Sequence, residues 1–138
     1  MMQSNAVGRR AEIRDTVTVD KTAVQIGSGT LSVLATPHMA ALMEHAAVLA
    51  LADLLDAGQT SVGTRLEISH DAATPVGMEI RAEAEIVSVS ENGKFVNFTV
   101  RAWDALGPIG SGTHTRAIVN AERFLSRCNA KVIHFDPL

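Results

Sequence analysis

The chain has 138 residues, a formal net charge of −3, and 46% hydrophobic but only 4% aromatic residues. This length fits one domain with a substantial core, and 20% charged residues argue against intrinsic disorder. Twelve basic against fifteen acidic residues, with no clustered Lys/Arg stripe, argue against nucleic-acid binding. The single cysteine, Cys128, excludes an intrachain disulfide and fits a reducing compartment. No apolar segment is long enough for a signal core or a membrane span, so we expect a cytoplasmic protein without a membrane partner.

The first half of the chain predicts an arm, one or two short strands and a long helix. Residues 1–12 are expected to form a flexible arm, and residues 13–26 alternate in part between apolar and polar types, as strands do. Thr36-Pro37 marks a helix start, because threonine caps free amides and proline is tolerated at the first helical position. We expect this helix to run to about Asp56. Apolar residues on most of its sides predict a buried central helix.

The second half of the chain is expected to be extended. The predicted strands cover residues 61–70, 79–90, 95–103 and 109–124, with a hairpin at Asn92-Gly93 and a C-terminal tail over 125–138. One buried helix followed by antiparallel strands predicts a single α+β domain, 1–138, in which a curved sheet wraps the helix. Because this helix is so apolar, one small sheet does not cover it fully, and we expect a homodimer or a tetramer.

Three polar residues lie where the pattern predicts apolar surroundings. Glu44 has alanines, a valine and a leucine as helical neighbours, and a carboxylate there needs a partner or has a raised pKa. A solvated position at a subunit seam explains it equally well. His70 shares a strand face with Leu66 and Ile68, so it should point at the helix, as a buried structural histidine or as a catalytic base. Thr36 is explained by capping, although free amides at a helix start also suit an oxyanion.

Spacing limits how these residues act together. Thr36 and Glu44 lie eight residues apart, about 12 Å along a helix axis. Either the carboxylate comes from a second subunit, or the two residues act on different parts of a substrate. Arg116, in the last strand, is a candidate for binding an anionic group or for plain solvation, and His114 on the same strand face has no assigned role. The sequence contains no nucleophile elbow, phosphate loop, dinucleotide fingerprint or metal-ligand spacing, so no cofactor or metal is expected.

Three blocks together resemble a known family. They are ATPHMAALMEHAA, ISHDAATPVG and GSGTHTRA, within Leu34 to Phe124, and they are similar to hotdog-fold acyl-CoA thioesterases of the fluoroacetyl-CoA type. The resemblance implies a helix wrapped by an antiparallel sheet, paired into a dimer with active sites at the interface. It also implies an acyl-CoA substrate, catalytic roles for Thr36, Glu44 and His70, and substrate contacts from Gly63 and Arg116.

The chain departs from that family at two points. The fluoroacetyl-specific type has a phenylalanine lid just before the helix, whereas this chain has no aromatic residue before Phe95, so fluoroacetyl specificity is not expected. Pro37 also stands where that type has glycine. The missing lid keeps a second hypothesis open, a non-catalytic acyl-CoA-binding or sensing module. A hotdog hydratase is disfavoured, because no aspartate here has a histidine five residues later.

Overall fold

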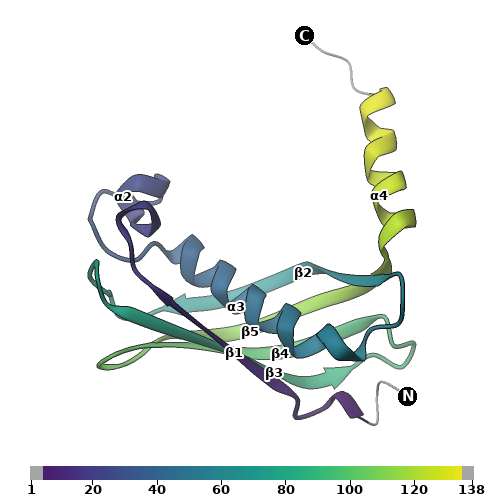
Figure 1. The fold of residues 1–138 in the computed structure, drawn as a ribbon, viewed down its shortest axis with the longest axis horizontal. Helices are drawn as coiled ribbons and strands as arrows, with labels where there is room; N and C mark the ends of the chain where they lie inside the picture. The colour runs from purple at the N-terminus through teal and green to yellow at the C-terminus, as the bar shows by residue number, and fades with distance from the viewer. Residues whose placement is uncertain (1–4, 135–138) are drawn as a thin grey trace.

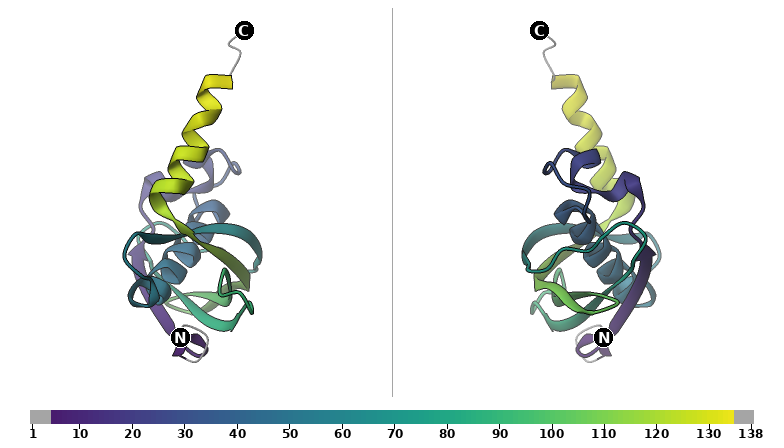
Figure 2. Two further views of the ribbon diagram at one scale, coloured as in Figure 1. Left: turned by 90° about the vertical axis from the view of Figure 1, so that its right-hand side faces the viewer. Right: turned by 90° about the vertical axis from the view of Figure 1, so that its left-hand side faces the viewer.

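The computed structural model describes residues 5–134, which form a curved five-stranded antiparallel sheet around one long helix (Figures 1 and 2). The sheet order is β1-β3-β4-β5-β2, so β1 and β2 are its edges. The strands are β1 (Arg10–Thr16), β2 (Gln59–His70), β3 (Glu79–Val89), β4 (Phe95–Asp104) and β5 (Gly107–Asn120). The predicted α+β architecture is confirmed.

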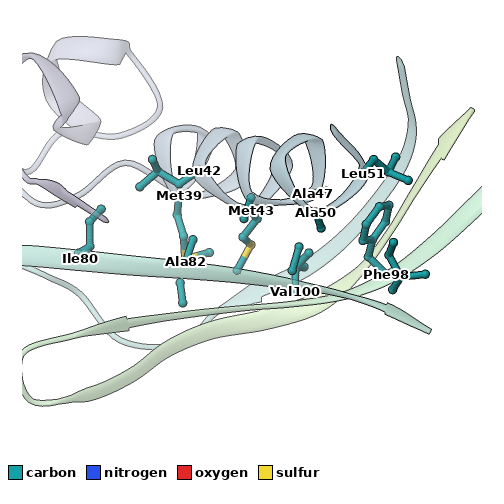
Figure 3. Close-up of a cluster of buried hydrophobic side chains, with 14 of the residues drawn as sticks. Met39, Leu42, Met43, Ala47, Ala50, Leu51, Ile80, Ala82, Phe98 and Val100 are labelled. Carbon is teal, nitrogen blue, oxygen red and sulfur yellow. The ribbon is translucent and has the colours of Figure 1, made fainter. Parts of the chain in front are cut away.

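The long helix α3 (Thr36–Leu51) supplies one side of the core. It ends earlier than the predicted Asp56, because a 3-10 turn, η2 (Ala52–Leu54), follows it directly. Figure 3 shows Met39 and Met43, two of its buried side chains, pointing toward the sheet. The buried residues of α3 are Met39, Leu42, Met43, Ala46, Ala47, Ala50 and Leu51. The opposite stripe of the helix is exposed in this single chain, so α3 is not surrounded on all sides as the sequence suggested.

The sheet side of the core follows the period-two pattern of β3 and β4. Alternate residues of the two strands pair across the sheet and are buried, as in Ala84 opposite Val100 and Ile86 opposite Phe98. Small side chains such as Ala82 allow the helix to approach the sheet closely. Phe98 is the largest fully buried side chain, and its truncation to alanine would cost about 3–5 kcal/mol of stability.

The N-terminal predictions are wrong in two respects. The expected arm over residues 1–12 is ordered where it is described: Ala6 is fully buried, Gly8 donates its N–H to the Ile86 carbonyl, and β1 begins at Arg10. Residues 1–4 lie outside the described residues. The strand pattern up to residue 26 fails after Thr16, where η1 (Val19–Lys21) and the short helix α2 (Ala23–Ile26) follow. The apolar positions there, such as Ile26, are exposed and line no sheet face.

The C-terminal prediction also needs correction. The last strand ends at Asn120 and not at Phe124, because the Asn120 side chain accepts the Arg123 N–H at 2.9 Å and caps a new helix. This helix, α4 (Ala121–Asn129), continues into η3 (Ala130–His134), so residues 125–134 of the expected tail are helical. Residues 135–138 lie outside the described residues. Figure 1 shows α4 projecting away from the sheet, past the β2 edge. Among the described residues, no helix is long and apolar enough to cross a membrane.

Candidate active site

The first turn of α3 brings two of the candidate residues together. Thr36 is the first helical residue, and the N-cap is Ala35 with no side-chain cap bond, so the predicted capping role of Thr36 is wrong. Its hydroxyl is instead hydrogen-bonded to His70, with 2.7 Å between Thr36 Oγ1 and His70 Nδ1. A residue near the start of the helix and the last residue of β2, far apart in sequence, therefore form one polar pair.

Close strand pairing fixes the position of His70 in this pair. His70 lies opposite Gly110, and Ile68 lies opposite Gly112, on the neighbouring strand β5. A Cβ atom at Gly110 would lie 2.6 Å from the Ser69 carbonyl oxygen, so only glycine lets the two backbones approach this closely. The glycines within β5 thus mark a close backbone approach.

The Thr36–His70 pair borders a small cavity. The cavity has a volume of about 230 Å³. It is lined by Ala23, Ser28, Val33, Leu34, Thr36, His70, Asp71, Ala72 and Ala73. The other ring nitrogen of His70, Nε2, is buried and has no hydrogen-bond partner among the described residues. Most buried polar groups are hydrogen-bonded, so this nitrogen is an exception. It remains free to exchange a hydrogen bond or a proton with a molecule in the cavity.

Glu44 belongs to a separate cluster two turns further along α3. Its Oε2 lies 3.6 Å from Arg116 NH1 and 4.0 Å from His114 Nε2, both on β5. About 12 Å of helix rise separates Glu44 from Thr36. The structure therefore brings Thr36 and His70 together but leaves the third predicted catalytic residue elsewhere in the same chain.

Arg116 is buried and its guanidinium donates within the chain. Nε donates to Ser61 Oγ at 2.8 Å, NH2 to the Ser61 carbonyl at 3.1 Å, and NH1 lies 3.1 Å from His114 Nε2. Burial lowers the pKa of Arg116 below its ordinary value, opposed by the charge of Glu44. The Arg116 guanidinium therefore contacts Ser61, His114 and the Glu44 carboxylate of its own chain. The sequence alone suggested instead that Arg116 binds an anionic group or is solvated.

His114 is a member of this cluster that the sequence left unassigned. Its Nδ1 lies 2.7 Å from the Arg65 carbonyl oxygen, so Nδ1 carries the proton and Nε2 accepts from Arg116. Burial lowers the pKa of His114 and so favours the neutral ring, although the hydrogen bond with the Arg65 backbone acts in the opposite direction. Its position two residues before Arg116, on the same strand face, was the available sequence signal.

Gly63 makes room for the Glu44 carboxylate. It pairs with Arg116 next to a β-bulge in β2. A Cβ atom at this position would lie 2.6 Å from Glu44 Oε2 and 3.2 Å from His114 Cε1. Gly63 therefore contacts the carboxylate cluster and not the Thr36–His70 pair. Among residues 5–134, no group of three or more His, Cys, Asp or Glu side chains is placed to hold a metal ion.

Comparisons with known proteins agree with this architecture. The family of fluoroacetyl-CoA-specific thioesterases (FlK) matches residues 17–122. The fluoroacetyl-CoA thioesterase of Streptantibioticus cattleyicolor is 44% identical over 105 residues, which are 76% of this chain and 71% of that protein. A solved structure of fluoroacetyl-CoA thioesterase FlK superposes with a TM-score of 0.82 at 37% identity, covering 95% of this chain and 97% of the other. A variant of that enzyme in complex with acetyl-CoA gives a TM-score of 0.85 at 35% identity, covering 91% and 97%.

The sheet, the enclosed helix and these neighbours define the hotdog-fold thioesterases, which are thioester hydrolases. Within that class, the chain belongs to the fluoroacetyl-CoA-specific thioesterase family. The resemblance on which the sequence expectations depended is confirmed.

Proposed function

We propose that this chain hydrolyses an acyl-CoA to a free acid and CoA, with the reaction centred on Thr36 and His70. The observation that carries the proposal is the 2.7 Å hydrogen bond between the Thr36 hydroxyl and His70 Nδ1 at the edge of a cavity. A hydroxyl bonded to a basic ring nitrogen is the arrangement by which enzymes activate a weak nucleophile. Family membership supplies the substrate class.

In the proposed mechanism, His70 is the base and the acid. His70 Nδ1 accepts the Thr36 proton as Thr36 Oγ1 attacks the thioester carbonyl, and His70 then gives this proton to the thiolate of CoA as the carbon–sulfur bond breaks. The backbone N–H of Thr36, at the positive end of the α3 dipole, suits the negative charge that develops on the carbonyl oxygen. Water then attacks the acyl-threonine ester, which releases the acid and restores the hydroxyl.

We assign Glu44 to the active site of a second copy of the chain. The edge strand β2 has twelve residues, and in the described part of the chain one row of its backbone groups has no strand partner. Beside it, α3 exposes an apolar stripe in which Val48 is 40% and Leu49 43% exposed. Two β2 edges that pair antiparallel would place the Gly63 region of one chain, with its Glu44, opposite the His70 end of the other.

The cavity indicates a small acyl group. At about 230 Å³ it is smaller than most sites for drug-sized ligands, and its described lining is aliphatic and polar, with His70 as its one ring. The segment before α3 contributes Ser28 and Val33, which do not shield the acyl group as an aromatic lid would. We therefore propose acetyl-CoA and similar short-chain acyl-CoA thioesters as substrates, without a preference for the fluorinated form. The exposed free Cys128 fits the cytoplasm as the compartment.

The test is thiol release from acetyl-, fluoroacetyl-, medium-chain and arylacetyl-CoA. Wild-type protein should release thiol from the short-chain members, and Thr36→Ala, His70→Ala and Glu44→Ala should abolish the release while the fold is kept. Full activity in the His70→Ala variant would overturn the assignment. Absence of turnover across the panel, with CoA still bound, would favour the non-catalytic binding module.

A further inference from the structure

A wide groove lies at the far end of β2 from His70. Its volume is about 770 Å³, within the range of ligand pockets, and it lies between α4, the β3–β4 hairpin and the end of β5. Four cationic side chains line it, and among the described residues no aspartate or glutamate does. These four, called the groove cations below, are Lys94, Arg123, Arg127 and Lys131. Two partly exposed aromatic rings, Phe95 and Phe124, lie among them.

The cations in the groove differ from most others in the molecule, which are paired with carboxylates. Of the twelve Lys and Arg side chains, seven lie within 4.0 Å of a carboxylate. Within residues 5–134, the other five are Arg101 and the groove cations, which form no such ion pair. The sequence shows no clustered basic stripe, because the fold of α4 and the hairpin brings together charges that are apart along the chain.

We propose that this groove binds the nucleotide end of CoA, a 3′-phosphorylated adenosine diphosphate. The proposal rests on the proposed function, because it assigns the part of the same substrate that lies outside the acyl cavity. The ligand combines several phosphate charges with an aromatic base, and the groove offers guanidinium and ammonium groups beside two phenyl rings. Arginine is suited to phosphate because it donates two parallel hydrogen bonds to it.

The spacing along α4 fits a ligand with separate phosphate groups. Arg123 and Arg127 lie four residues apart in α4, so they share one face of the helix about 6 Å apart along its axis. Lys131 follows in η3, which continues α4, and lines the same groove. Lys94 approaches from the hairpin on the other side and lies 5.6 Å from the Phe95 ring centroid. One face of a helix and one hairpin thus present positive charge toward a shared space.

The proposed dimer places the groove beside a reaction centre. Gln59, at the groove, and His70 are the two ends of β2, about 36 Å apart in one chain. Antiparallel pairing of two β2 edges reverses this order, so the groove of one chain lies near the His70 end of the other. Figure 1 shows α4 extending past the β2 edge, the direction in which a paired chain would lie. The groove cations of one copy would therefore hold the nucleotide while the other copy hydrolyses the thioester.

Cys128 gives a direct binding test that does not need turnover. It is the single cysteine, is exposed and lines the groove, so its alkylation by iodoacetamide reports access. Adenosine 3′,5′-bisphosphate, which has no thiol, should slow the alkylation several-fold in the wild-type protein. The double variant Arg123→Glu/Arg127→Glu should lose this protection. Arg101→Glu, which changes the other cation without a carboxylate partner, should keep it.

Kinetics separates this proposal from the proposed function. For acetyl-CoA, the double variant should raise KM about tenfold or more, with kcat nearly unchanged and a weaker dependence of KM on salt. For the acetyl thioester of pantetheine, which lacks the nucleotide, wild type and variant should behave alike. Equal Cys128 protection in all variants, or equal KM for acetyl-CoA, would overturn the groove assignment. Nucleotide protection without any thiol release would overturn the proposed function alone.

Discussion

The first turn of α3 and its middle differ in how their polar groups are satisfied. Thr36 is exposed, and one ring nitrogen of its partner His70 has no hydrogen-bond partner within residues 5–134 and lies beside a cavity. In the middle, Arg116 is buried and donates to two neighbours while it faces the Glu44 carboxylate. The first region has space and a base, and the carboxylate at its cavity, Asp71, accepts a hydrogen bond from the Ser69 hydroxyl at 3.0 Å. The second region has a carboxylate, Glu44, that faces Arg116. We propose that a complete site needs both regions, supplied by two chains.

The largest expected effect is on turnover when the first region is changed. His70→Ala or Thr36→Ala should lower kcat by about 10²–10⁴-fold, because each removes one partner of the proton transfer. Melting temperature should change little, since Thr36 is exposed and His70 is only half-buried. His45→Ala, at an exposed histidine of the same helix, is the matched control and should keep wild-type kcat. Retained turnover in His70→Ala would mean that the first region is not the reaction centre.

Stability should respond most strongly in the second region. Arg116→Met leaves the Ser61 carbonyl and the His114 ring without their donor, and should cost about 2–3 kcal/mol in urea unfolding. Arg65 forms an ion pair with Glu67, and each of these two side chains is 70% exposed. Arg65→Met should therefore change the free energy of unfolding by less than about 0.5 kcal/mol. If the two substitutions had equal effects, the middle of α3 would not be a positioned cluster.

A smaller effect is expected from Gly63→Ala. The new methyl group would lie 2.6 Å from Glu44 Oε2, so the carboxylate must move, and kcat should fall by up to about a hundredfold. Gly112→Ala is the contrasting variant, because its methyl group collides with the backbone of β2 and should lower the melting temperature. A Gly63→Ala protein with wild-type kcat would show that the position of Glu44 does not matter for catalysis.

The smallest effect is a pH dependence of stability from His114. Burial lowers its pKa in the folded state, whereas the unfolded chain has the ordinary value of about 6.5. The unfolded state therefore binds more protons below that value, and the stabilising contribution is complete above pH of about 6.5 and is lost as the pH falls. Urea unfolding at neutral and mildly acidic pH should show a larger loss for wild type than for His114→Gln. Identical losses in the two proteins would contradict a neutral, buried His114.

The fold was largely predictable because its signals are local. The alternation in β3 and β4, the Asn92-Gly93 hairpin and the apolar run of α3 each reflect burial of one face or stripe. Helix α4 was missed because it is polar, contributes no buried residue, and begins at a cap that follows a strand without interruption. A segment that projects from the core carries no burial pattern from which a periodicity can be recognised.

The site was predictable only in part because its contacts are non-local. Thr36 looked like a helix cap, and no local feature shows that its hydroxyl instead meets a histidine 34 residues away. Gly63 and Arg116 were identified through family resemblance, and the reason for that glycine, the space for Glu44, appears only in three dimensions. The helix rise between Thr36 and Glu44, in contrast, did indicate from sequence that one chain would not unite them.

The most direct test of a site shared between two chains is complementation between two inactive variants. Chains carrying Glu44→Ala and His70→Ala would be co-expressed with different affinity tags, and the mixed dimer would be purified and assayed with acetyl-CoA. If Glu44 of one chain serves His70 of the other, each mixed dimer contains one intact site, and thiol release should return to a substantial fraction of the wild-type rate. A pure mixed dimer as inactive as either parent variant would contradict the shared site.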